Sequence, residues 1–184
     1  TLFNRLVGRR IAIVEDTPGI TRDRLYASVE WRGFAFTVID TGGIILDDQD
    51  PLTVQVRQQA AIAMDEADAI IFVCDGMDGI TTADRELAEA LRPAKVPVFL
   101  VVNKADSERV KQSAVEFYEL GVQQVYPISA AHGHGIADML DDLIDAIPEV
   151  EPTDEDDDSI RLAIIGRPNV GKSTLLNKLV GEKL

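Results

Sequence analysis

Residues 160–173 read I-R-L-A-I-I-G-R-P-N-V-G-K-S, and this stretch decides the fold. The apolar run before Gly166 is typical of a short buried strand, and the residues from Gly166 to Ser173 form the pattern G-x-x-x-x-G-K-S. In this pattern the glycines let backbone N–H groups point at phosphate oxygens, and the following helix adds its positive dipole end. We therefore predict a phosphate-binding loop, the alternative being a glycine-rich turn with an unrelated lysine. The residues expected to line the phosphates are Gly166, Asn169, Val170, Gly171, Lys172, Ser173 and Thr174.

Length, composition and charge restrict the classes of protein to which the sequence can belong. The chain has 184 residues, 46% of them hydrophobic and 27% charged, which is usual for a globular α/β domain. Its net charge of −14 argues against binding DNA or RNA through a broad basic face. No stretch is long and apolar enough to span a membrane and no signal peptide is evident, so we expect a cytoplasmic protein without a membrane partner. The single cysteine, Cys74, lies in an apolar run and is expected to be buried.

Strands and helices are predicted to alternate along the chain. The predicted strands are 25–31, 34–40, 69–74, 97–102, 125–128 and 160–165. The predicted helices are 1–7, 54–67, 82–92, 110–120, 136–147 and one that begins near Lys172. The first two strands are separated by Arg32-Gly33 and indicate a hairpin, with Trp31 expected in the core. The order of the remaining elements predicts an α/β fold with a doubly wound, mostly parallel, six-stranded sheet.

Two motifs are candidates for sensing the terminal phosphate. Asp40 ends a predicted strand and could hold Mg²⁺ through a water molecule, and the N–H of Gly43 could donate to a γ-phosphate. Thr21 lies in the long loop 8–24, and its hydroxyl could complete the Mg²⁺ shell when a γ-phosphate is present. Taken alone, these residues also fit an aspartate-glycine turn and a helix-cap or turn threonine.

Two further motifs are candidates for reading a base. Asn103-Lys104-Ala105-Asp106 follows a strand, and the carboxylate of Asp106 can accept two hydrogen bonds from guanine, a pair of donors that adenine lacks. Asn103 would brace this loop, and the stem of Lys104 would cover the base. The small residues Ser129 and Ala130 follow the next strand and would let a backbone N–H approach guanine O6. Each motif alone also fits a surface turn.

The order of these motifs is that of a guanine-nucleotide-binding domain, and three of them lie at strand ends, where open α/β sheets bind ligands. The sequence resembles the translation-factor-related GTPases and, more closely, the tandem double-GTPase family called EngA or Der. The resemblance covers essentially the whole chain and rests on D-T-P-G-I-T-R-D, I-D-T-G-G-I, N-K-A-D, I-S-A-A-H-G-H-G and G-R-P-N-V-G-K-S. It implies a G domain of the P-loop NTPase fold.

The resemblance also implies a function. The expected ligands are GTP and GDP with Mg²⁺, the reaction is hydrolysis of GTP, and the catalytic candidates are Lys172, Thr21 and Gly43. The metal candidates are Ser173, Thr21 and Asp40. The expected partner is the large ribosomal subunit, whose maturation the family assists, through a second G domain and an RNA-contacting domain that this sequence does not complete.

An internal repeat indicates how the chain is divided. Thr1–Arg10 and Thr174–Lys183 are identical at six of ten positions, and the second copy follows the phosphate loop. We therefore expect residues 1–148 to form a first G domain without its own first strand and phosphate loop. The stretch 149–159 is expected to be an acidic linker, and 160–184 to hold the strand, phosphate loop and first helix of a second domain.

Residues 160–184 have two possible positions. In one hypothesis they fold back into the first domain, between the strands 34–40 and 69–74, and produce a circularly permuted G domain. One copy of the repeat would then be displaced from the helix position that both copies match. In the other hypothesis they stay apart, as the start of an uncompleted second domain. Pairing of Leu162–Ile165 with both neighbouring strands would distinguish the two.

Hydrolysis is expected to need assistance. The residue after Gly43 is Ile44, where Ras-type proteins place a glutamine that orients water, and isoleucine has no polar group for that task. The family resemblance suggests a K⁺ ion, held partly by Asn169, that supplies charge near the phosphates. A nucleotide-gated binding module with incidental hydrolysis and an inactive fragment are the alternative readings. His132 and His134 lack further ligands nearby in the sequence and are interpreted as loop histidines.

Overall fold

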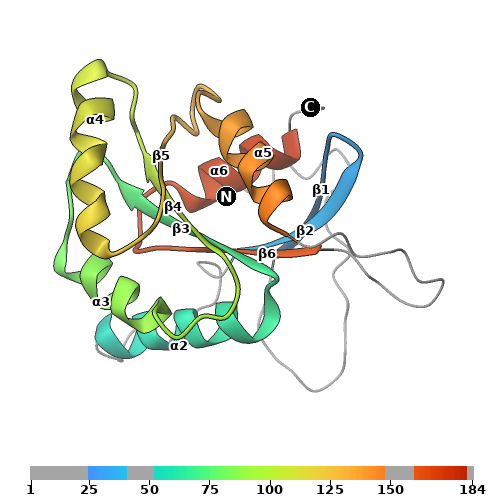
Figure 1. Cartoon of the computed structure of the whole chain (residues 1–184), viewed down its shortest axis with the longest axis horizontal. Helices are drawn as coiled ribbons and strands as arrows, with labels where there is room; N and C mark the ends of the chain where they lie inside the picture. The colour runs from blue at the N-terminus through green and yellow to red at the C-terminus, as the bar shows by residue number, and fades with distance from the viewer. Residues whose placement is uncertain (1–24, 41–51, 148–159, 182–184) are drawn as a thin grey trace, which may run out of the picture.

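A computed structural model describes residues 25–40, 52–147 and 160–181 of the chain (Figure 1). Its strands are β1 (Leu25–Trp31), β2 (Phe34–Asp40), β3 (Ala69–Asp75), β4 (Val98–Asn103), β5 (Val125–Pro127) and β6 (Ile160–Ile165). Its helices are α2 (Leu52–Glu66), α3 (Thr82–Leu91), α4 (Glu108–Ser113), the 3₁₀ helix η2 (Ala114–Leu120), α5 (Ile136–Ala146) and α6 (Lys172–Gly181). The predicted helix at 1–7, and with it the first copy of the repeat, lies outside the described residues.

The six strands form one sheet in the order β1-β2-β6-β3-β4-β5. Only β1 and β2 run antiparallel, and they form the predicted hairpin, with Arg32 and Gly33 at positive φ in the turn. All the other neighbouring strands pair in parallel. The prediction of a doubly wound, mostly parallel, six-stranded sheet is confirmed.

The strand β6 comes from the end of the sequence and lies inside the sheet. It pairs in parallel with β2, where Val38 lies opposite Leu162, and with β3, where Ile71 lies opposite Ile164. These are the pairings that the fold-back hypothesis requires, so residues 160–181 do not stay apart from the sheet. Without β6, the neighbouring edges of β2 and β3 would both lack hydrogen-bond partners.

Helices cover both faces of the sheet (Figure 1). The helices α5 and α6 pack on one face, and α2, α3 and η2 pack on the other. Alternate residues of a strand divide between these two cores: in β6, Leu162 and Ile164 belong to the first core, whereas Ala163 and Ile165 belong to the second. Strands covered on both faces explain why the sequence shows continuous apolar runs there. Cys74 is buried in the second core, as predicted, and burial raises the pKa of its thiol.

The helix predicted over 110–120 is divided in the structure. The α-helix α4 ends at Ser113, and the chain continues as the 3₁₀ helix η2. The N–H of Ala114 is shared among three successive carbonyl groups, as happens where α winding tightens into 3₁₀ winding. Gly121 then ends the segment in a left-handed conformation, with φ of 80°, which glycine adopts readily at the end of a helix.

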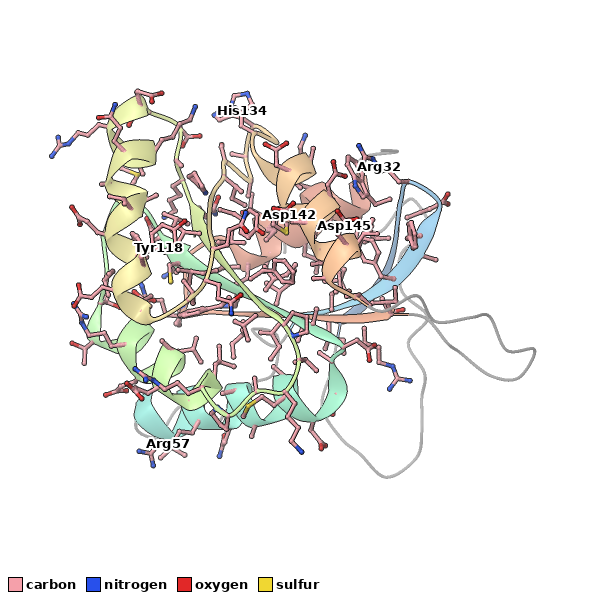
Figure 2. All side chains as sticks on the ribbon, in the orientation of Figure 1. Arg32, Arg57, Tyr118, His134, Asp142 and Asp145 are labelled. Carbon is pink, nitrogen blue, oxygen red and sulfur yellow. The ribbon has the colours of Figure 1, made fainter. Side chains whose placement is uncertain are left out.

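The tip of the β1–β2 hairpin is attached to α5. Trp31 packs against the first core but is only partly buried, and its indole N–H donates to Asp141 at 2.7 Å. Arg32 pairs with the same carboxylate at 3.1 Å. Figure 2 shows Arg32 at the hairpin tip, next to α5. Trp31 therefore has a polar role that its sequence context did not predict.

Candidate functional site

The candidate residues gather at one edge of the sheet because they follow the carboxyl ends of parallel strands. The phosphate loop 166–171 connects β6 to α6, the loop 104–107 follows β4, and Ser129 and Ala130 come shortly after β5. The strands β6, β3, β4 and β5 are neighbours and point the same way. This is the edge at which open α/β sheets bind ligands.

The phosphate loop needs glycine at its two invariant pattern positions. A Cβ added to Gly166 would lie 2.3 Å from the carbonyl oxygen of Val73 in β3. A Cβ added to Gly171, whose φ is 98°, would lie 2.3 Å from Nδ2 of Asn103. Any larger residue would therefore push the loop off the end of the sheet, away from the neighbouring strands.

Lys172, the first residue of α6, lies against the phosphate loop. Its Nζ donates to the carbonyl oxygens of Gly166 at 2.8 Å and Arg167 at 3.0 Å. The lysine is buried, and these bonds place its charge beside the backbone of the loop's first two residues. Ser173 and Thr174 follow in the first turn of α6, and both residues are exposed. Asn169 is exposed and has a positive φ of 65°.

Asn103 joins the phosphate loop to the loop after β5. Its Nδ2 donates to the carbonyl oxygen of Val170 at 2.8 Å, and its Oδ1 accepts the N–H of Ala130 at 2.9 Å. Both Asn103 and Val170 are buried. The side chain therefore braces three segments that are far apart in the sequence. Since the N–H of Ala130 is bonded to Asn103, this N–H would have to change partner to reach a base.

The carboxylate of Asp106 is held by the loop after β5. The hydroxyl of Ser129 donates to Oδ1 of Asp106, and His132 Nε2 lies 3.7 Å from the same oxygen. Asp106 stays exposed, with a side-chain exposure of 47%, whereas Ser129 is buried. Within the described ranges no three metal-ligating side chains gather into a metal site, and His132 and His134 are exposed loop residues.

Lys104 has an ion-pair partner that the sequence analysis did not name. Its Nζ pairs with Asp75 at 2.5 Å, so the end of the side chain points to the carboxyl end of β3. Asp75 is almost completely buried, and its other carboxylate oxygen accepts the N–H of Met77. The sequence did signal this partner, because Asp75 ends a buried apolar strand just as Asn103 does.

Three further candidates, Asp40, Thr21 and Gly43, are predicted for the γ-phosphate side of the site. Asp40 is the last residue of β2, and its main chain pairs with Ile164 of β6, two residues before the phosphate loop. Thr21 and Gly43 lie outside the described residues, so their predicted contacts stay predictions.

Arg167 is a residue of this edge that the sequence reasoning missed. Its guanidinium donates to Asp78 at 2.6 Å and lies 3.7 Å from the carboxylate of Asp84. Asp78 belongs to the turn between β3 and α3, and Asp84 to the first turn of α3. The signal in the sequence was a charged residue at a variable position of the phosphate-loop pattern.

Two surface hollows formed by described residues lie away from the candidate site. One lies between α2 and α3 and includes Arg57 and Arg85, and the other includes Val96, Tyr126 and Asp145. Figure 2 shows Arg57 on α2 and His134 in the loop before α5, far apart on opposite sides of the sheet. The candidate site is thus identified by chemistry and topology, and not by the depth of a hollow. None of the helices in the described ranges combines the length and apolar character that crossing a membrane requires.

The fold and the loop between β6 and α6 define the class of the protein, a phosphate-loop nucleotide-binding domain. The family model described as "50S ribosome-binding GTPase" matches residues 1–104 and 161–184, which is more than half of the chain. The chain belongs to this family. The two matched stretches are the two that the sheet brings together at β2, β6 and β3.

Curated relatives are similar to the chain over its whole length. A protein named GTPase Der from Bacillus cytotoxicus is 50% identical over 183 residues, and one of the same name from Geobacillus thermodenitrificans is 52% identical. Each comparison covers 100% of this chain and 42% of the relative, so the chain spans less than half the length of these proteins.

Solved structures support the same fold. A crystal structure of Era in complex with MgGDPNP and nucleotides 1506–1542 of 16S ribosomal RNA has a TM-score of 0.59 and 26% identity, covering 85% of this chain and 55% of that one. A structure of translation elongation factor SelB from Methanococcus maripaludis, in complex with the GTP analogue GppNHp, has a TM-score of 0.52 and 19% identity, covering 73% of this chain and 31% of that one. The second likeness concerns the fold alone.

Proposed function

We propose that the chain binds guanine nucleotides and hydrolyses GTP with the help of Mg²⁺. The observation that carries this proposal is the contact between Asn103 and Val170, which links the motif that would read the base to the loop that would bind the phosphates. A single nucleotide could then touch both. The names of the family and of the curated relatives support the same activity.

Each part of the site has a separate task in this proposal. Backbone N–H groups of the loop at 166–173 and the ammonium of Lys172 would bind the phosphate oxygens. The Asp106 carboxylate would accept the two guanine donors. The aliphatic stem of Lys104 would cover the base, whether or not the ammonium of Lys104 stays paired with Asp75. The oxygen ligands for Mg²⁺ would come from Ser173, Asp40 and Thr21, and the ion would neutralise charge that develops on the phosphates.

We propose the ribosome as the partner, and the large subunit in particular, whose assembly the chain would assist in the cytoplasm. The description of the matched family names the 50S ribosome, and Era, which is similar in structure, was solved with ribosomal RNA. The chain has a net charge of −14, so an RNA-contacting surface would have to come from elsewhere in a longer protein. The division of the chain into residues 1–148, 149–159 and 160–184 is also part of this proposal.

The nucleotide proposal is tested by equilibrium binding of fluorescent GDP to the chain, with unlabelled GTP, ATP and XTP as competitors. We expect GTP and GDP to compete and ATP to fail, because adenine cannot donate the pair of hydrogen bonds that Asp106 accepts. Release of phosphate from GTP should require Mg²⁺. Equal competition by ATP, or no binding of any nucleotide, would contradict the proposal.

A second candidate, a nucleotide-gated binding module with incidental hydrolysis, is favoured by one feature. Ile44 occupies the position at which a water-orienting side chain would be expected, so hydrolysis without assistance should be slow. Single-turnover hydrolysis with and without K⁺, and with and without 50S subunits, distinguishes the two. Acceleration by either addition supports the enzyme and, for K⁺, the proposed role of Asn169. Nucleotide-dependent binding to 50S subunits without acceleration supports the module.

A further inference from the structure

Arg167 connects the phosphate loop to the helix α3. The residue follows Gly166 directly, and its side chain is 18% exposed. One terminal nitrogen, Nη2, donates to Asp78 Oδ2 at 2.6 Å. The nitrogen nearer the stem, Nε, lies 3.7 Å from Asp84 Oδ2. The guanidinium thus faces two carboxylates, from the turn before α3 and from the first turn of α3.

The second of these carboxylates is completely buried. Asp84 has 0% exposure, and its Oδ2 accepts both the N–H of Thr81 at 2.9 Å and the Thr81 hydroxyl at 2.7 Å. The first of these bonds and the bond from the Asp84 N–H to Thr81 Oγ1 form the capping box of α3. Its other oxygen, Oδ1, has no hydrogen-bond partner among the described residues, and neither has Nε of Arg167. A buried donor and a buried acceptor without partners each cost free energy, and here they belong to neighbouring, oppositely charged groups.

Arg167 and Asp78, which are joined by a hydrogen bond, both stay charged at neutral pH. The hydrogen bond from Arg167 is the main cause that lowers the pKa of Asp78. For Arg167 itself, burial opposes the charge, but the hydrogen bond to Asp78 and the charge of Asp84 outweigh it and raise the pKa. A shift of about 1 Å would bring Nε within hydrogen-bond distance of Asp84.

Arg167 is held at its main chain as well as at its side chain. Its carbonyl oxygen accepts a hydrogen bond from Lys172, and its guanidinium is bonded to the α3 side. The loop between Arg167 and Lys172 is therefore fixed at one end by charged contacts that lie outside the loop. Phosphate binding through backbone N–H groups depends on holding this loop in one shape.

We propose that Arg167 is a positioning residue for the phosphates: its contacts with Asp78 and Asp84 hold the phosphate loop in the shape that binds phosphate. The residue acts through the loop, without touching the nucleotide. This inference rests on the proposed nucleotide site. It predicts a loss of phosphate affinity without a loss of base selectivity when the contacts are removed.

The test compares Arg167→Met with Arg85→Met in the full 184-residue chain. Arg85 is a matched control, because it pairs with Glu119 at 2.5 Å on the exposed side of α3, and neither residue belongs to the candidate site. In the nucleotide-free chain, we expect hydrogen exchange of the amides at 169–172 to become about tenfold faster in Arg167→Met and to stay unchanged in Arg85→Met, the effect of losing one charge-assisted hydrogen bond. This first readout needs no nucleotide, so it decides the anchoring role even if the proposed function fails.

The second readout is nucleotide affinity. In Arg167→Met we expect the Kd for GDP and the KM for GTP to rise about tenfold, with kcat nearly unchanged and the ratio of GTP to XTP affinity unchanged. Arg167→Lys should recover part of the affinity, because an ammonium can pair with Asp78 but cannot contact both carboxylates in the geometry of a guanidinium. A wild-type chain that binds no nucleotide would refute the proposed function and not the anchoring.

The outcome that overturns the inference is a folded Arg167→Met chain with wild-type loop exchange and wild-type nucleotide affinity. A selectivity ratio that changes together with affinity would also overturn it, because a general loosening of the site would then be the cause. If Arg167→Met does not fold, Asp78→Asn replaces it as the test, since Asp78 is largely exposed. We expect about a threefold loss of affinity in that variant, and no loss would overturn the inference.

Discussion

The two halves of the candidate site are held together in different ways. On the base side, side chains bond to other loops: Asn103 accepts the N–H of Ala130, and Asp106 accepts the hydroxyl of Ser129. On the phosphate side, Lys172 donates to carbonyl groups of its own loop, and glycines let that loop lie against β3. The base half thus depends on hydrogen bonds of side chains to other loops, whereas the phosphate half depends on the conformation of the loop backbone. Substitutions should therefore separate base selectivity from phosphate affinity.

The largest expected effect is on the base side. Asp106→Asn replaces a carboxylate by an amide that cannot accept both guanine donors, and its C=O and NH₂ groups instead suit xanthine. We expect the affinity for GTP to fall roughly a thousandfold, the loss of two hydrogen bonds to a charged group, and XTP to become the better ligand. Competition between the two nucleotides measures this. Asp145→Asn, on the exposed side of α5, is the control, and unchanged GTP affinity in Asp106→Asn would refute the base-reading role.

The next effect is confined to the phosphate side. Gly166→Ala places a methyl group against the carbonyl oxygen of Val73. The clash is costly because both the phosphate loop and β3 meet there through their backbone, which cannot move aside as a side chain can. We expect about 2–3 kcal/mol of lost stability, measured by urea unfolding, and about a hundredfold weaker GTP binding. The GTP-to-XTP ratio should stay unchanged. Gly79→Ala, at a positive φ with open space around it, is the control for backbone strain alone. Equal behaviour of the two variants would contradict the close-contact explanation.

A smaller effect is expected at the junction of the halves. Asn103→Ala removes the amide that bonds to Val170 and Ala130, so a buried carbonyl and a buried N–H lose their partner. We expect about 2 kcal/mol of lost stability, with weaker binding of GTP and XTP alike. Thermal unfolding measures the loss of stability, and competition with fluorescent GDP measures the affinities for GTP and XTP. Gln124→Ala, which removes an exposed hydrogen bond to Asp142, should change neither.

The smallest effect is expected at Ser129. Ser129→Ala leaves Asp106 without its hydroxyl donor, but the carboxylate is exposed and water replaces the lost bond. We expect about a threefold weaker affinity for GTP, no change in phosphate-side exchange and little change in stability. Fluorescent GDP competition is sensitive enough to detect it. A loss as large as that of Asp106→Asn would mean that the hydroxyl, and not the carboxylate, carries the recognition.

Much of the fold follows from local patterns in the sequence. The hairpin, the buried strands and the stop at Gly121 depend on turn residues, apolar runs and a glycine C-cap, which act over a few residues. The position of β6 could also be inferred from the repeat. Residues 174–183 follow a strand and a phosphate loop, and the similar residues 1–10 are expected to need such a strand before them. The division of 110–120 into α and 3₁₀ turns could not be predicted, because it depends on a small balance of hydrogen-bond geometries.

The site was predictable in its residue types but not in its contacts. The glycine pattern and the position of Asn103 at a strand end predict a phosphate loop and a bracing amide, and the structure places both at one edge. The pairing of Lys104 with Asp75 and of Arg167 with Asp84 joins residues on different elements. The residue types had local cues in the sequence, but which residues pair depends on the three-dimensional arrangement of β3, α3 and β6.

The place of β6 inside the sheet has a consequence for the time course of folding. Phe36 of β2 lies opposite Ile160, so the contact that completes the middle of the sheet closes a loop of more than a hundred residues. Contacts between residues so distant in sequence are slow to form, because the chain must lose much freedom before they form. While this 184-residue chain folds, β2 and β3 keep unpaired edges until β6 reaches them, and in that interval those edges are available to other chains. The strand that gives the domain its phosphate loop is therefore also the strand whose arrival ends the period of greatest risk of aggregation.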